Sequence, residues 1–138
     1  MRFMMIVKAS KDSEAEILPR EAEIAAMMKF NQKMAKAGVM LAGEGLRASS
    51  KGARVRFRAG KRAVTHGPFT GARQLVAGFW QIEVRSKEEA IEWAKRAPFK
   101  SGEIELRQIL EADDFGAEFT PELRDQSERL RAQLEAKP

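Results

Sequence analysis

The chain has 138 residues, a third of them charged, and its formal net charge is +5. This length suits one domain with a small appendage, and it is enough to bury a core without covalent staples. The absence of cysteine excludes disulfides, thiolate catalysis and cysteine metal sites, and it suits a reducing cytoplasm, where we expect the protein.

Residues 2–8 are predicted to form the first strand. Phe3 and Met5 point to one side and Met4 and Ile6 to the other, so both faces are apolar, as in a strand at the centre of a sheet. The apolar run is too short for the core of a signal peptide, and no later run is long enough to cross a membrane. We therefore expect no membrane contact.

Apolar residues at helical spacing then predict a helix that starts at Pro19 and ends at Gly38. Asn31 interrupts its methionine-rich stripe, and we interpret it as a satisfied polar residue at the edge of the stripe. A second strand is expected over residues 39–46.

Residues 53–66 predict a β-hairpin that turns at Ala59 and Gly60. Val55 and Phe57 alternate with three arginines, so we expect one face to be buried and the other wet. The basic face could meet phosphates, but no aromatic stacking platform accompanies it. We favour a charged edge that blocks strand-to-strand aggregation, and nucleic-acid binding is disfavoured.

A strand over residues 77–84, a helix from Ser86 to Arg96 and a strand over residues 103–110 complete the core elements. A terminal helix after Thr120 has too narrow an apolar stripe for a core helix, and we expect it to strap across the outside of this subunit or a partner. The order predicts an α+β, ferredoxin-like βαββαβ fold with an inserted hairpin and an extra C-terminal helix. With both helices on one face, the bare face predicts a homodimer with a cavity between two sheets.

The segments MRFMMIVKAS, AGVMLAGEGL, GARVRF, THGPFTGARQLVAGFWQIEV, SKEEAIEWAKRAP, GEIELRQILEADDFG and TPELRDQSERLRAQ together resemble the YCII-related domain family, in its DGPF-motif branch. The resemblance implies a dimeric α/β barrel, with the family domain over residues 1–116 and a helical extension over residues 117–138. It also implies a poorly defined activity. Many relatives are encoded near extracytoplasmic-function sigma factors, and other branches are proposed to be small enzymes that use a histidine and an aspartate.

The chain departs from the family motif in its central loop. His66 stands where the family has aspartate, Gly71 and Gln74 stand at the two glutamate positions, and Arg73 stands at the lysine position. The loop has lost its acidic character, so a mechanism that relies on the motif carboxylate is not carried over.

His66 is the only histidine of the chain. Its imidazole could exchange a proton near neutral pH, and Gly67 and Pro68 would make a stiff turn that a ligand can approach closely. The competing interpretation is that His66 ends a strand and bonds to a neighbouring backbone group. A metal site is not expected, because one histidine without spaced partners leaves too few ligands.

Glu44 is a second candidate, because Gly43 and Gly45 on either side would expose the backbone to a ligand. The alternative is a strand bend that needs glycine and leaves Glu44 solvated. Arg73 could clamp an anion, or it could be an ordinary surface arginine. Phe69, together with Phe79 and Trp80, would form the apolar walls of the pocket.

We therefore expect a protein that binds or transforms a small, anionic molecule in a pocket at the dimer interface, without a cofactor. His66 would act as acid or base, Arg73 would orient an anion, and Glu44 would polarise the ligand or accept a proton. The alternative is a noncatalytic regulatory protein whose C-terminal helix or hairpin contacts a partner. The sequence leaves open whether the protein is an enzyme.

Overall fold

The structure is a computed structural model that describes residues 1–138, apart from the side chain of Arg73. Its strands are β1 (Arg2–Lys8), β2 (Met40–Gly45), β3 (Ala53–Arg58), β4 (Lys61–His66), β5 (Val76–Glu83) and β6 (Ile104–Gln108). Its α-helices are α1 (Lys11–Glu14), α2 (Glu21–Lys36), α3 (Lys87–Lys95) and α4 (Pro121–Glu135). The chain divides into two compact units, Met1–Gln108 and Ile109–Pro138, which are described separately.

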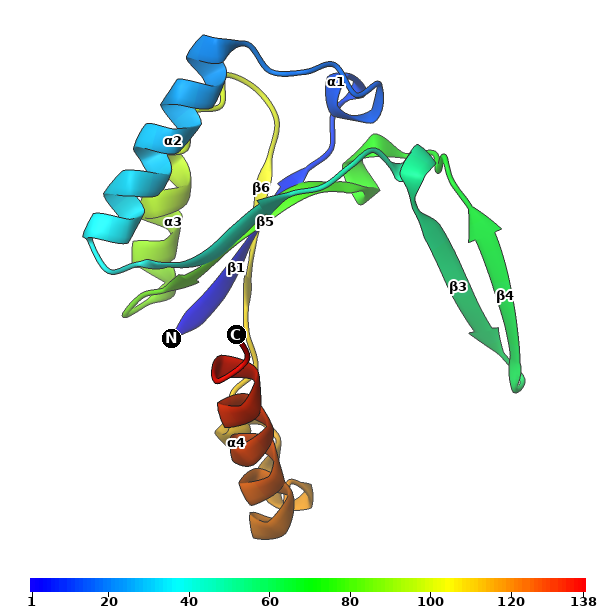
Figure 1. Cartoon of the computed structure of the whole chain (residues 1–138), viewed down its shortest axis with the longest axis vertical. Coiled ribbons are helices and arrows are strands. Elements are labelled where there is room, and N and C mark those ends of the chain that lie inside the picture. The colour runs from blue at the N-terminus through cyan, green and yellow to red at the C-terminus, as the bar shows by residue number, and fades with distance from the viewer. The chain divides into compact units, whose positions relative to one another are not determined.

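The first unit contains a four-stranded antiparallel sheet in the order β2-β5-β1-β6. Helices α2 and α3 connect strands of this sheet and lie together on one of its faces (Figure 1). This order, with two helices on one face, is that of a ferredoxin-like fold, so the predicted α+β class is confirmed. The strand β1 pairs on both sides, which confirms its predicted central position.

The core lies between the sheet and its two helices. Phe3 and Met5 of β1 and Ile82 of β5 are buried on this side, and they pack against Phe30 and Met34 of α2. Burying a side chain of this size contributes about 1.5–3 kcal/mol, so the strict alternation along β1 and β5 fixes which face of the sheet meets the helices.

Helix α2 starts later than predicted, since its first residue is Glu21 and Arg20 is the N-cap. The expectation that Pro19 is the first helical residue is wrong. The first backbone hydrogen bonds of the helix run from the amides of Glu23 and Ile24 to the carbonyl of Arg20, which makes Arg20 the N-cap. The side chain of Arg20 forms no capping hydrogen bond. The expected end at Gly38 agrees with the structure, where this glycine has a left-handed φ of 72°.

The inserted hairpin β3–β4 is a separate two-stranded sheet. It turns at Ala59 and Gly60 as predicted, and both residues have positive φ, 49° and 77°. The expectation of a buried face is wrong, because Val55 and Phe57 are 51% and 70% exposed. Their alternation with arginine is real, but no other element of the first unit packs over them.

The second unit contains α4 with two short 3-10 turns before it, Ala112–Asp114 and Gly116–Glu118. Thr120 caps the helix by accepting a hydrogen bond from the Leu123 amide at 3.3 Å. No residue of α4 is buried, as its narrow stripe predicted. The proposed family-domain boundary between residues 116 and 117 stays a prediction. Of the helices in the described chain, none combines the length and apolar character needed to cross a bilayer.

Candidate functional site

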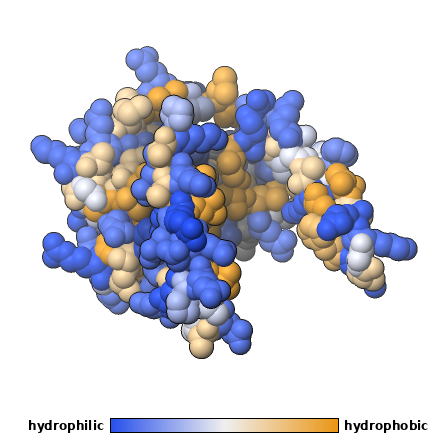
Figure 2. Space-filling view, turned by 60° about the horizontal axis from the view of Figure 1, so that its bottom comes forward, coloured by the Kyte–Doolittle hydropathy of each residue, from blue (hydrophilic) through white to orange (hydrophobic). Residues whose placement is uncertain are grey.

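A cavity of about 580 Å³ opens in the first unit, on the side of the sheet that carries α2. Its walls come from the connection between α1 and α2, from α2 itself, from β2 and from β5. The rim is unusually apolar, because Ile17 and Leu18 on the connection are 62% and 84% exposed. Figure 2 shows hydrophobic and hydrophilic side chains side by side on one face of the molecule. The volume is in the range of small-molecule pockets.

Trp80 forms the inner wall of the cavity and is only 5% exposed. The edge of its ring system meets Phe30 at a centroid distance of 5.4 Å, and Phe99 lies at 6.2 Å on another side. Its indole Nε1 donates a hydrogen bond to Asn31 Oδ1 at 2.8 Å. Because an indole N–H can only donate, the amide oxygen of Asn31 must face it, and the amide NH₂ with its two donors is left for the cavity that Asn31 also lines.

Gly43 sits directly against Trp80. A Cβ at Gly43 would lie 2.7 Å from Trp80 Cδ1 and 2.9 Å from Met40 Cε, closer than carbon atoms can approach. The strand β2 therefore needs glycine here to approach the tryptophan. At Gly45 a Cβ would meet nothing within 4 Å, so that glycine is not required for space.

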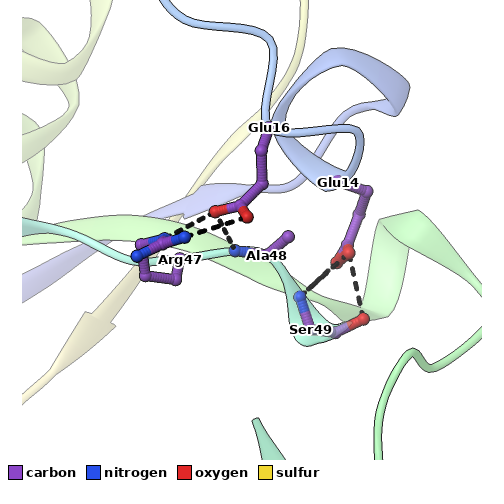
Figure 3. A network of polar contacts seen from close by, with 5 residues as sticks. All are labelled: Glu14, Glu16, Arg47, Ala48 and Ser49. Atoms are coloured by element: carbon purple, nitrogen blue, oxygen red, sulfur yellow. Dashed lines mark hydrogen bonds and ion pairs between the residues drawn. The ribbon is translucent and has the colours of Figure 1, made fainter. Parts of the chain in front are cut away.

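Glu16 and Arg47 form a polar wall at the mouth of the cavity (Figure 3). The Arg47 guanidinium donates through Nε to Glu16 Oε2 at 2.6 Å and through Nη2 to Oε1 at 3.1 Å. The hydrogen bond from Arg47 holds the pKa of Glu16 below its ordinary value of 4.5, and the same contact raises the pKa of Arg47. This bidentate pair fixes the connection before α2 to the segment after β2.

A second carboxylate, Glu14, lies near this pair outside the cavity lining (Figure 3). It accepts the Ser49 amide at 3.0 Å and the Ser49 hydroxyl at 2.9 Å. The same hydroxyl accepts the Phe69 amide at 2.9 Å. Ser49 thus joins helix α1 to the turn after β4, so the segments before and after the hairpin are both held to α1.

The structure brings one part of the predicted site together at the cavity. Five residues named from the sequence line it, two glycines and the glutamate of β2 with two aromatics of β5: Gly43, Glu44, Gly45, Phe79 and Trp80. Glu44 pairs with Phe79 across the strands and is exposed. The predicted pocket between two sheets involves the other face of the sheet and a second subunit, so it stays a prediction.

The other part of the predicted site lies elsewhere in this subunit. His66 ends β4 opposite Ala53 and is exposed. Gly67 donates its amide to Gly52 O at 3.0 Å, and Arg54 stacks over the Phe69 ring at 3.9 Å. These residues and Pro68 do not line the cavity, so in one subunit His66 and Glu44 do not meet. Arg73 was predicted to orient an anion, but its side chain lies outside the part of the chain that the structure describes, so this role stays a prediction.

Three important cavity residues were not singled out as functional from the sequence: Glu16, Asn31 and Arg47. Asn31 carried a signal, because it is the polar interruption of the apolar stripe of α2. Glu16 and Arg47 carried none, because each resembles an ordinary surface charge until the fold pairs them. Among the described residues, no group of three or more histidine, aspartate or glutamate side chains is placed to hold a metal ion.

Comparison with known proteins gives one family match. The family model described as YCII-related domain matches residues 1–113. No curated protein sequence matches the chain. Among solved structures, the chain is similar to 5-chloro-2-hydroxyhydroquinone dehydrochlorinase from Burkholderia phenoliruptrix AC1100, in complex with 2,5-dihydroxybenzoquinone. That match has 13% identity and a TM-score of 0.42, and it covers 83% of this chain and 98% of the other.

Proposed function

The chain belongs to the YCII-related family, and from this premise we propose that it binds a small, largely apolar molecule with an oxygen acceptor in the cavity beside Trp80. The observation that carries the proposal is the amide of Asn31. Its oxygen is held by Trp80, so its NH₂ group is oriented in advance towards an acceptor. A carboxylate, phenolate or carbonyl oxygen would meet those donors while the rest of the molecule contacts the apolar walls.

We propose Glu44 for any proton transfer at the interface of an assembled dimer. It pairs with Phe79, which in turn pairs with Ile6, so its side chain belongs to the uncovered face of the sheet and not to the face of Trp80. In the cavity itself, the carboxylate of Glu16 is engaged by Arg47. A carboxylate beside a bound oxygen could accept or return a proton once the ligand excludes water. His66 and Arg73 remain predicted contributors in an assembled dimer.

The uncovered face of the sheet supports the proposed homodimer. Met4 and Ile6 of β1 point away from α2 and α3 and are only half-buried in a single subunit. Apolar side chains in the middle of an open sheet face favour a second subunit as cover. The DGPF-motif branch and a cytoplasmic location are part of the same proposal.

The test is ligand binding by the full chain and by Asn31→Asp. This substitution keeps an oxygen for Trp80 Nε1 but removes both amide donors and adds a negative charge. We expect thermal stabilisation of the wild type by one-ring carboxylic acids or phenols, and no stabilisation by the same rings without the oxygen. Asn31→Asp should weaken binding by about ten-fold or more, which corresponds to about 1.4 kcal/mol.

Gln32→Leu is the control, because Gln32 is the next residue on α2 and is exposed outside the cavity. It should bind as the wild type does. Equal affinity of wild type and Asn31→Asp, with both variants folded by circular dichroism, would contradict the assigned role of Asn31. Calorimetry on the same samples separates lost affinity from lost stability.

A further inference from the structure

The hairpin β3–β4 is a two-stranded sheet with no buried residue. An isolated pair of strands is at best marginally stable in water, and a third layer normally covers one of its faces. Within the first unit, residues 1–108, no other element provides that layer. The hairpin is therefore a surface in need of a partner.

One face of the hairpin is apolar at its centre. Val55 lies opposite Val64, and Phe57 lies opposite Arg62 on the same face. Val55, Val64 and Phe57 are 51%, 58% and 70% exposed. Figure 2 shows this element at the right, with hydrophobic and hydrophilic surface side by side. The arrangement is that of an interface with an apolar centre and a charged rim.

The charge of the hairpin limits what can cover it. Residues 53–66 contain five arginines or lysines and no acidic residue. Two hairpins would repel each other if they packed face to face. The partner surface should therefore be acidic as well as apolar.

A segment of this same chain has those properties. Residues 111–122 contain five acidic residues and no basic one, which is the opposite of the hairpin. Apolar side chains accompany them, since Phe115 is 55% exposed and Leu123 at the start of α4 is 45% exposed. Opposite charge and matching apolar surface thus occur on two elements of one sequence.

We propose that the hairpin of one chain docks on the acidic C-terminal unit, residues 109–138, of a second copy. The apolar centre of Val55, Phe57 and Val64 covers the leucine and phenylalanine side chains of that unit, and the arginines meet its carboxylates at the rim. A nucleic acid would satisfy the arginines but not the apolar face, and for this reason a second copy is favoured.

The test uses two charge reversals in the full chain. Arg56→Glu, Arg58→Glu and Lys61→Glu together change the net charge of the hairpin, residues 53–66, from +5 to −1. Glu118→Lys, Glu122→Lys and Glu128→Lys together change that of residues 109–138 from −4 to +2. None of these six side chains forms an ion pair in the described structure. Association is read by energy transfer between two populations, one labelled at Ala63→Cys on the hairpin and the other at Ala132→Cys on α4. The natural chain has no cysteine, so each label is unique.

Each reversed chain alone should lose energy transfer, with the apparent dissociation constant raised by about ten-fold or more because like charges now face each other. A mixture of the two reversed chains should recover it, because every hairpin then meets a unit of opposite charge on the other chain. Recovery on mixing is expected only for contact between copies.

Energy transfer that none of the variants changes would overturn the proposal. So would loss in both reversed chains without recovery on mixing, provided circular dichroism shows both folded. The hairpin would be assigned to nucleic acid instead if the wild type showed no energy transfer and bound a mixed-sequence oligonucleotide, and if Arg56→Glu/Arg58→Glu/Lys61→Glu abolished that binding.

Discussion

Two segments of this molecule place a titratable residue beside glycine, and they differ in structure. Gly43, Glu44 and Gly45 of β2 and the turn from His66 to Phe69 each combine a titratable side chain with a glycine. In the first, Gly43 faces Trp80 on the wall of a cavity. In the second, Gly67 packs on the backbone carbonyl of Ser49.

The difference shows what a glycine can and cannot indicate. Its missing side chain signals that something approaches the backbone closely, but not whether that is a ligand or another part of the chain. At Gly43 the close neighbour belongs to a pocket wall, whereas at Gly67 it is the backbone carbonyl of Ser49, the residue whose amide donates to Glu14. The turn after β4 is therefore, in a single subunit, a structural anchor, and β2 is the better candidate for ligand contact.

Gly67→Ala should have the largest effect. Its Cβ would overlap the Ser49 carbonyl oxygen, and backbone cannot yield as a flexible side chain can. We expect a loss of about 2–4 kcal/mol in the free energy of unfolding, measured by urea denaturation. Gly52→Ala is the matched control, since its Cβ would lie 3.6 Å from the same oxygen. Equal stability of both variants would show that the turn is not anchored there.

Gly43→Ala should have a smaller effect on stability and a clear effect on binding. Trp80 must shift to accept the methyl group, which loosens its hydrogen bond to Asn31. We expect about 1–2 kcal/mol of destabilisation together with weaker ligand binding, measured by thermal unfolding and calorimetry. Gly45→Ala, with nothing near its Cβ, should change neither. If it impaired binding as strongly, β2 rather than Trp80 would determine the site.

Removing the Glu16–Arg47 pair by Glu16→Gln should have the smallest effect on stability, and its effect on the pH dependence of the melting temperature should appear only at acidic pH. The pKa of Glu16 is lowered in the folded protein by the Arg47 hydrogen bond, so its contribution is complete above the unfolded value near 4.5. That contribution is lost as the pH falls below this value towards the folded pKa. The melting temperature of the wild type should therefore fall more steeply below this pH than that of Glu16→Gln.

Glu21→Gln, which removes one carboxylate from the first turn of α2, controls for composition in the same series. Parallel melting curves for wild type and Glu16→Gln across the acid range would contradict the assigned pairing. Salt should reduce the difference between them, because the pair is near the surface.

The fold could be predicted because its signals are local. The alternation of Phe3 and Met5 with Met4 and Ile6 places β1 at the centre of the sheet, and Ala59 with Gly60 marks the hairpin turn. Each of these signals depends on neighbours within a few residues, so no knowledge of the rest of the fold is needed.

The cavity could be predicted only in part, because its contacts are distant in sequence. Trp80 and Asn31 are 49 residues apart, and Arg47 meets Glu16 across 31. An irregularity between Met40 and Ala42 also shifts the register of β2 against β5, which alternation alone does not reveal. The prediction that the Val55 face of the hairpin is buried was wrong for a related reason. Periodicity shows that a face is apolar, but it does not show what covers that face.

The hairpin enters and leaves the domain at a single backbone hydrogen bond, from the Gly67 amide to the Gly52 carbonyl. Because this bond holds the two ends of the insertion next to each other, the strands between them can be lengthened, shortened or replaced. Such a change costs the rest of the domain little conformational entropy. Grafting a foreign loop between Gly52 and Gly67 should consequently leave the sheet and its cavity intact.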